Sequence, residues 1–189
     1  MDQKIPDQEI ITMILAGDTD SFSVLVDRYQ AFVYTLTLRI LSDQSEAEEA
    51  AQDAFIKCFQ AMKSFSGKSK FSTWLYRIAF NTAISYKRKH RIEVSGLDDS
   101  TYKLASSAKA SDELNREEQK RFINNAINRL SPDDATVLIL FYKKELTLEE
   151  ISEVTGMKNS AIKVKLFRAR KRLADELHRQ LAYETESLL

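Results

Sequence analysis

The chain has 189 residues, of which 43% are hydrophobic and 30% charged, and its 28 basic residues balance its 28 acidic ones. This composition favours a soluble folded protein over a disordered one, and no apolar run approaches the roughly 20 residues of a membrane helix. The single cysteine cannot form an internal disulfide, and the acidic N-terminus lacks signal-peptide features. We therefore expect a cytoplasmic protein that does not insert into a membrane.

Helix-forming residues dominate, and only four glycines and two prolines interrupt them, so an all-α fold is predicted. In the first half, Ser45 is the expected N-cap of the third helix. A loop around Gly67 precedes the fourth helix. Apolar periodicity predicts helices at about 7–16, 20–41, 45–62 and 72–90.

The composition changes after the fourth helix. Residues 93–111 are rich in serine and aspartate and lack a sustained apolar stripe, which predicts a flexible linker. The linker divides the chain into two small helical domains, 1–92 and 112–189. In the second domain, Ser131 followed by Pro132 is a helix start signal, and Thr147 to Glu150 fits a capping box. Helices are expected at about 112–130, 132–142, 147–156 and 159–182.

Residues 63–91 carry eight Lys or Arg residues and no acid, with aromatic residues between them. This mixture suits melted nucleic acid, because cations follow the phosphates while rings stack on exposed bases at about 1–3 kcal/mol per base. The alternative is a solvated basic face whose aromatic residues, Trp74 especially, belong to the core. The candidate contacts are Lys68, Phe71, Trp74, Tyr76, Arg77, Asn81, Ser85, Lys87 and Arg88.

Residues 147–173 predict a helix-turn-helix: a short helix, a turn at Thr155-Gly156, and a second helix with no acid between Val154 and Ala174. Such a second helix can lie in the major groove, with early residues on base edges and flanking cations on phosphates. The alternative is a packed helical hairpin with a charged outer face. The candidate contacts are Lys158, Ser160, Lys163, Val164, Phe167, Arg168 and Lys171.

The predicted helix over residues 44–59 has an acidic front followed by apolar residues. This pattern fits either a docking face for a protein partner or an ordinary amphipathic helix. Site chemistry is missing elsewhere: there is no glycine-rich phosphate loop, and His90 and His178 are far apart with no Cys/His cluster for zinc. We expect no enzymatic activity and no cofactor.

Three motifs in this order resemble the extracytoplasmic-function (ECF) subfamily of bacterial RNA polymerase sigma factors, over nearly the whole chain. Lys70 to Ala79 followed by Asn81 resembles the promoter-melting helix of that family. Residues 47–55 resemble its polymerase-docking helix. Residues 148–156 with 168–173 resemble its promoter-reading helix-turn-helix.

The resemblance implies a transcription initiation factor that binds core RNA polymerase and promoter DNA. Domain 1–92 would dock on the clamp coiled coil of the largest polymerase subunit and open the downstream promoter element. The loop before Phe71 would capture a flipped base in a pocket around Phe71 and Lys68. Domain 112–189 would read the upstream element as duplex, and an anti-sigma factor would hold the protein inactive. The docking residues implied are Glu49, Gln52, Asp53 and Phe55.

The chain departs from the family pattern in the recognition helix, at Lys158, Ser160, Ala161 and Val164. Val164 replaces a small polar residue, and we hypothesise that it contacts a thymine methyl group. Two other classes remain open at this point. A stand-alone dimeric helix-turn-helix regulator would bind a palindromic duplex but leaves the segment around Trp74 without a role. A helical interaction module would not explain two acid-free basic runs.

Overall fold

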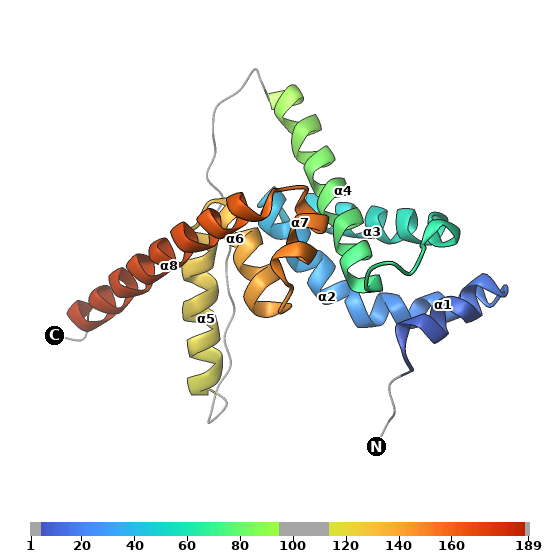
Figure 1. Ribbon diagram of the computed structural model, residues 1–189. Coiled ribbons are helices and arrows are strands. Elements are labelled where there is room, and N and C mark those ends of the chain that lie inside the picture. The colour runs from blue at the N-terminus through green and yellow to red at the C-terminus, as the bar shows by residue number, and fades with distance from the viewer. Residues whose placement is uncertain (1–4, 95–113, 188–189) are drawn as a thin grey trace.

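The computed structural model describes residues 5–94 and 114–187, with side chains described within 5–90 and 121–180. All regular structure in these residues is helical, which confirms the all-α class (Figure 1). Most of the predicted linker lies outside the described residues, although α4 extends through residue 94. The helices are α1 (Asp7–Leu15), α2 (Phe22–Leu41), α3 (Gln44–Gln60), α4 (Phe71–Val94), α5 (Leu114–Asn128), α6 (Pro132–Leu138), α7 (Leu148–Thr155) and α8 (Asn159–Ser187).

The N-terminal domain is built on α2, α3 and α4, each of which packs against the other two. Leu25, Leu36 and Leu75 are fully buried between them, together with small residues of α3 such as Ala54. Small side chains on α3 let its neighbours approach closely, while the larger leucines fill the remaining space. The three helices therefore share one hydrophobic core.

The N-cap of α3 differs from the sequence prediction. Asp43, not Ser45, caps the helix: its carboxylate accepts a hydrogen bond of 2.9 Å from the backbone N–H of Glu46. Both residue types are good N-caps, so the choice depends on where the chain turns. Ser42, with a left-handed φ of 63°, ends α2 and places Asp43 at the start of α3.

Helix α1 is joined to α2 by polar contacts. The Asp7 carboxylate accepts hydrogen bonds from the Arg28 guanidinium and the Tyr29 hydroxyl. Ile10, Ile11 and Ile14, three, four and seven residues after Asp7 and so on the same face of α1, are buried in the core. Burial, followed by the bond to Asp7, raises the pKa of Tyr29 well above its usual value.

The helix start signals of the C-terminal domain are confirmed. The Ser131 hydroxyl accepts from the backbone N–H of Asp134 at the start of α6. Thr147 and Glu150 form a complete capping box on α7, and Gly156 ends α7 with a left-handed φ of 73°. The chain after α6 continues as predicted but as a π-helical turn, η3 (Ile139–Lys143), which helical periodicity does not distinguish from an α-helix.

The C-terminal domain also uses buried carboxylates. Glu176 on α8, whose side chain is 6% exposed, accepts from Arg129 at 2.5 Å and from Arg179 at 2.6 Å. Asp134 on α6, equally buried, pairs with Arg172 on α8. Buried charges are tolerated when they are paired and hydrogen-bonded. These pairs fix α8 against the helices that support it.

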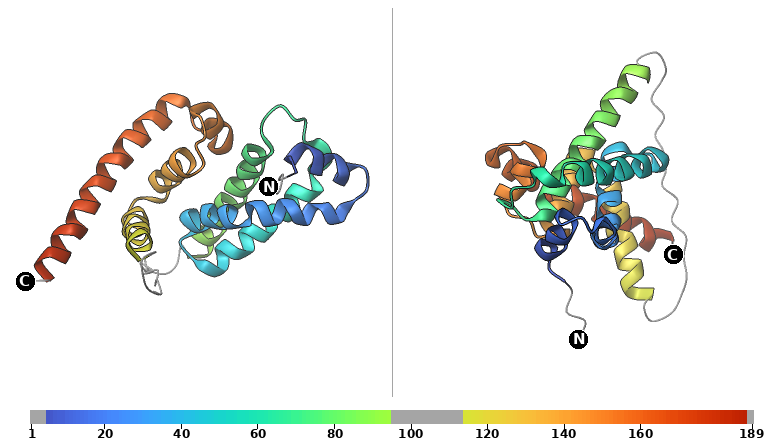
Figure 2. Two further views of the ribbon diagram at one scale, coloured as in Figure 1. Left: turned by 90° about the horizontal axis from the view of Figure 1, so that it is seen from below. Right: turned by 90° about the vertical axis from the view of Figure 1, so that its right-hand side faces the viewer.

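The two domains touch each other. Helix α7 packs against α4, and α6 packs against α2 (Figures 1 and 2). An ion pair of 2.9 Å joins Lys70, just before α4, to Glu150 on α7. The Lys144 ammonium lies 4.5 Å from the centre of the Phe32 ring on α2. The seam therefore contains both polar and apolar contacts.

Candidate nucleic-acid and polymerase interfaces

Helix α4 presents a basic outer face. Arg77, Asn81, Ser85 and Arg88 are exposed, and their spacing places them along one side of the helix. The Ser85 hydroxyl donates to the backbone carbonyl of Asn81 at 2.9 Å, which occupies the hydroxyl proton but leaves the amide of Asn81 exposed. Lys87 is exposed next to this row. Five of the candidate contacts therefore lie on one accessible surface.

Two of the aromatic candidates do not lie on that surface. Phe71 is 4% exposed and Tyr76 is 2% exposed, so neither ring is accessible to a base in this structure. Phe71 packs against Tyr29 and Phe65 at centroid distances of 5.6 and 5.8 Å, and Tyr76 packs against Phe32 at 4.7 Å. The alternative interpretation of the aromatics as core residues holds for these two.

Trp74 occupies an intermediate position. It is half-buried, with its ring 5.0 Å from Phe65 and 6.0 Å from Phe71. The flipped-base pocket expected around Phe71 and Lys68 is not formed in this structure: the Phe71 ring is closed off, while Lys68 is exposed on the loop. The accessible groups at this end of α4 are Trp74, Lys68 and the loop backbone.

The recognition helix α8 separates its faces clearly. Ile162, Leu166 and Ala169 are buried, whereas the predicted DNA contacts all lie outside. Val164 is 48% exposed and Phe167 is 71% exposed. Burial gives no reason for apolar side chains at these two positions. The seven exposed candidates are Lys158, Ser160, Lys163, Val164, Phe167, Arg168 and Lys171.

The cations of α8 fall into two groups. Lys165 pairs with Asp133 at 2.9 Å and Arg172 pairs with Asp134, while the Arg170 guanidinium lies over the Phe141 and Tyr142 rings. These three contacts hold the helix on its domain. The predicted contacts Lys158, just before α8, and Lys163, Arg168 and Lys171 on its early part make no ion pair with the side chains that the structure describes. They are available for phosphates.

The predicted docking residues on α3 differ in how exposed their side chains are. Glu49 and Gln52 are exposed, Asp53 is half-buried and Phe55 is 9% exposed. Asp53 accepts a 2.9 Å hydrogen bond from the Tyr86 hydroxyl on α4, and this bond is the main cause that raises the pKa of Tyr86 to about 12. Phe55 therefore contributes mainly to the core, and Asp53 also joins α3 to α4.

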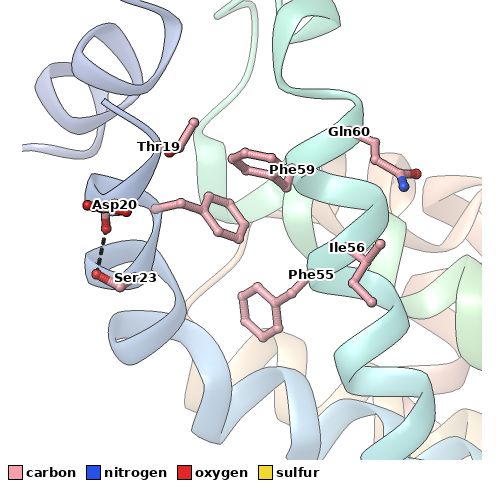
Figure 3. A pocket seen from close by; sticks show the side chains of 8 residues that line it. Thr19, Asp20, Ser23, Phe55, Ile56, Phe59 and Gln60 are labelled. Carbon is pink, nitrogen blue, oxygen red and sulfur yellow. Dashed lines mark hydrogen bonds between the residues drawn. The ribbon is translucent and has the colours of Figure 1, made fainter. Parts of the chain in front are cut away.

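An open groove of about 660 Å³ continues the docking face toward the end of α3 (Figure 3). Its floor is apolar, and Phe22 contacts Phe59 at 5.0 Å and Phe55 at 6.4 Å. Ile56 is 54% exposed and Phe59 is 39% exposed. The predicted docking residues do not include Ile56 or Phe59, although Phe59 ends the predicted docking segment 44–59 and the spacing of both from Gln52 places them on the same side of α3. The lining residues are Thr19, Asp20, Phe22, Ser23, Phe55, Ile56, Phe59 and Gln60.

Other kinds of site find little support in the described residues. No three His, Cys, Asp or Glu side chains gather as a metal site within the part of the chain that the structure describes. Among the described helices, none has the length and apolar character needed to cross a bilayer.

Family models identify the two domains. The model of Sigma-70 region 2 matches residues 25–92, and the model of Sigma-70, region 4 matches residues 123–173. A basic α4 in one domain and a helix-turn-helix in the other, each matched by one of these models, define a sigma-70 type protein. The chain is 35% identical over 176 residues to the ECF RNA polymerase sigma factor SigW of Bacillus subtilis, covering 88% of this chain and 94% of that protein. The chain belongs to the ECF RNA polymerase sigma factors.

Other relatives agree. The ECF RNA polymerase sigma-E factor of Haemophilus influenzae is 30% identical over 186 residues, covering 94% of this chain and 98% of that protein. The fold is similar to that of the sigma factor RpoE of Bartonella quintana, solved with the anti-sigma factor NepR, with a TM-score of 0.68 at 24% identity over 83% of this chain and 96% of that chain. CnrH, solved with the cytosolic domain of CnrY, gives a TM-score of 0.62 at 19% identity over 92% and 97%.

Membership in this family settles the class of function. The protein is a transcription initiation factor that binds core RNA polymerase and directs it to promoters. The stand-alone dimeric regulator, which left the α4 segment unexplained, is not favoured.

Proposed function

We propose that the two outer basic faces divide the promoter between them. The observation that carries this proposal is that each domain exposes one basic face, on α4 and on the early part of α8, and that the polar candidate contacts of both faces are exposed. The face of α4 takes the melted downstream element, and the face of α8 takes the upstream element as duplex. Each phosphate contact releases counterions, so binding by the polymerase complex weakens steeply with salt.

The melting face works through cations along α4 and a ring at its start. Arg77 and Arg88 hold the backbone of the displaced strand, and the Asn81 amide lies between them at a base edge. Trp74, half-exposed, offers a ring face for stacking, which is worth about 1–3 kcal/mol per base. Phe71 and Tyr76 support this surface from the core instead of contacting DNA.

A template comparison tests the melting face. Polymerase carrying Arg77→Ala/Arg88→Ala should bind core normally but form open complexes on duplex promoters about tenfold or more slowly, because at least two charge-assisted contacts are lost. A template with a pre-melted downstream element should restore initiation. If the variant fails equally on both templates, the face acts in some step other than melting.

Docking on polymerase uses the exposed side of α3. Glu49 and Gln52 supply polar contacts, and the adjoining groove receives an apolar side chain from the clamp coiled coil of the largest subunit. Phe55 acts as the floor of that groove, while Asp53 fixes the orientation of α3 through Tyr86. An apolar anchor surrounded by polar contacts is the usual composition of such an interface.

Size exclusion with core polymerase tests the docking face. We expect the wild-type protein and a Glu9→Lys control to co-elute with core, and a Glu49→Lys/Gln52→Lys variant to elute separately. Glu9 is exposed on α1, so the control introduces the same kind of charge change away from α3. Exposed positions are preferable to Phe55, whose truncation would also disturb the core. Co-elution of the α3 variant would exclude this docking face.

The remaining aspects follow from the family. We propose that the protein works in the cytoplasm, where polymerase meets promoters, and that it needs no catalytic group of its own. Two proteins of similar fold, the sigma factor RpoE and CnrH, were solved with the anti-sigma factor NepR and with the cytosolic domain of CnrY, respectively. An anti-sigma partner for this chain is the corresponding proposal. If this chain is overexpressed and does not activate transcription, a pull-down should recover an anti-sigma partner with it. Failure to recover any such partner would count against the proposal.

A further inference from the structure

Helix α1 precedes the part of the chain that the Sigma-70 region 2 model matches, because that match begins at residue 25. Neither DNA face includes a residue of α1. The helix nevertheless contacts both α2 and η2 (Met62–Ser64), the short helix that begins the loop before α4. Met62 is 2% exposed, so this end of the loop is held in the core. Helix α1 therefore touches two of the elements that support the start of the melting face.

Asp7 joins α1 to an aromatic ring of α2. Its carboxylate accepts hydrogen bonds from the Arg28 guanidinium and from the Tyr29 hydroxyl. Arg28 also donates to the backbone carbonyl of Ile5 at 2.8 Å, which fixes the chain just before α1. An acid in the first turn of a helix is ordinarily explained by the helix dipole. Here the carboxylate also bonds side chains of α2, and the Tyr29 ring is held at its hydroxyl end.

The Tyr29 ring in turn supports the start of α4. Its centroid lies 5.6 Å from that of Phe71 and 6.1 Å from that of Tyr76. Burial, followed by the charge of Asp7, raises the pKa of Tyr76 above its usual value, so the carboxylate acts on both tyrosines. Packed aromatic rings prefer particular relative orientations, so a ring that is fixed at one end restricts its neighbours. Asp7 thus acts on Phe71 through a single intervening ring.

Phe71 connects Tyr29 to Trp74, the ring that the proposed function assigns to base stacking. The Trp74 ring lies 6.0 Å from Phe71 and 5.0 Å from Phe65, and Phe65 is itself 5.8 Å from Phe71. Phe71 is 4% exposed, whereas Trp74 is half-buried and keeps part of its surface in solvent. Close packing leaves little free volume, so a displaced ring displaces the rings beside it. A shift of Tyr29 therefore changes how Trp74 is presented.

We propose that Asp7 is a positioning residue for promoter melting: through Tyr29, it fixes the ring cluster at the start of α4 and thereby the ring face that Trp74 offers to a melted base. The proposal rests on the proposed function, because it takes Trp74 as part of the melting face. Asp7 itself does not contact DNA, since its two carboxylate oxygens are used by Arg28 and Tyr29. Helix α1 is thereby added to the elements that open the promoter.

Tyr29→Phe is the sharpest variant, because it keeps the ring and removes only the hydroxyl that bonds Asp7. Asp7→Ala removes the acceptor instead. Asp7→Asn removes the charge but keeps an acceptor oxygen for Tyr29, so it is the conservative variant. Ile14→Val is the matched control: Ile14 is 7% exposed on the same helix, and its shortening weakens the packing of α1 while the bond between Asp7 and Tyr29 stays in place.

The rate of open-complex formation on a duplex promoter, with core polymerase saturated by each variant, measures the effect. Asp7→Ala and Tyr29→Phe should each slow it about three- to tenfold, the usual effect of losing one hydrogen bond. The double variant should be no slower than either single one, because both remove the same interaction. Asp7→Asn should recover most of the rate, Ile14→Val should keep it, and a template with a pre-melted downstream element should restore initiation by every variant.

The fluorescence of Trp74 reports the ring cluster directly, because Trp74 is the only tryptophan. Iodide quenching of the folded protein should increase in Asp7→Ala and Tyr29→Phe, since a loosened cluster exposes more of the ring. It should stay at the wild-type level in Ile14→Val, although that variant is also less stable. A role of Asp7 in stability alone predicts no such difference between the variants.

Unchanged melting in both Asp7→Ala and Tyr29→Phe would overturn the proposal. It would also be wrong if Ile14→Val slowed melting as much as they do, or if the pre-melted template restored nothing, because Asp7 would then act through stability or in another step. If Arg77→Ala/Arg88→Ala opens promoters at the wild-type rate, the proposed function fails instead. Iodide quenching then still decides whether Asp7 positions the ring cluster.

Discussion

The N-terminal domain keeps the cations of its DNA face away from its acids, whereas the C-terminal domain binds some of its cations with acids of its own. On α4, Arg77 and Arg88 are exposed, and the Arg28–Asp7 pair lies elsewhere, between α1 and α2. On α8, Arg172 and Lys165 are held by α6. Aromatic packing in the three-helix core holds α4, whereas α8 is also held by ion pairs with α6. Basic residues on α8 therefore serve two purposes that their sequence does not distinguish.

The largest expected effect concerns the apolar core of the N-terminal domain. Leu36→Ala should reduce its free energy of unfolding by about 2–5 kcal/mol, because Leu36 is fully buried. Urea unfolding followed by the fluorescence of Trp74, the only tryptophan, reports this domain alone. Val24→Ala on the same helix, at a position 40% exposed, is the control and should change little. If the transition seen by circular dichroism, which reports the helices of both domains, coincides with the Trp74 transition and shifts by the same amount, the two domains unfold as one.

Removing the ion pairs of α8 should lower the free energy of unfolding by less than the Leu36 substitution does, and by more for the buried pair than for the exposed one. Asp134→Asn should destabilise the C-terminal domain by about 1–3 kcal/mol, because it weakens the bonding of a buried group to Arg172. Asp133→Asn should cost less than about 1 kcal/mol, because the Asp133 side chain is 66% exposed. Urea unfolding followed by circular dichroism measures both. If both substitutions lower the free energy of unfolding by the same amount, burial does not determine how much each ion pair contributes to stability.

A third difference is expected in alkaline solution. Burial raises the pKa of the Cys58 thiol from 9.0 to about 12. Between these values the unfolded thiol has lost its proton and the folded one keeps it, so the unfolded state binds fewer protons and stability falls as pH rises. The loss is about 1.4 kcal/mol per pH unit across that window. Urea unfolding followed by Trp74 fluorescence, at pH values from about 8 to about 11, measures the free energy of unfolding as a function of pH. Cys58→Ala should make this free energy fall less steeply with pH. A slope that the substitution does not change would assign the loss to other groups, the buried tyrosines first.

The smallest effect belongs to the recognition helix. If Val164 contacts a thymine methyl group, Val164→Ser should weaken the preferred upstream element by about 0.8 kcal/mol, near fourfold, the value of one buried methylene. Replacing that thymine by deoxyuridine, which removes only the methyl group, should weaken the wild type by a similar amount and leave the variant unchanged. Competition binding by the polymerase complex measures both. No effect of deoxyuridine at any position of the element would refute the contact.

The helices and their limits were largely predictable from the sequence, because caps and breakers are local. Ser131, the capping box and Gly156 fall where they were predicted. The Asp43 cap and the π-turn η3 were not, since they depend on a few backbone angles. Periodicity could not separate Phe71 and Tyr76 from surface aromatics within a segment that is basic throughout. The contact between Lys70 and Glu150 joins residues far apart in sequence, and no local pattern announces it.

The seam between α3 and α4 has a consequence for how such a protein can vary over time. Tyr86 donates to Asp53 at 2.9 Å, and Lys57 donates to Thr82 at 3.4 Å. The outward sides of the two helices can therefore accept substitutions independently, one adapting to polymerase and the other to promoters, as long as the residues between them are retained. During evolution, the promoters that such a protein recognises can change while the surface that binds polymerase stays the same.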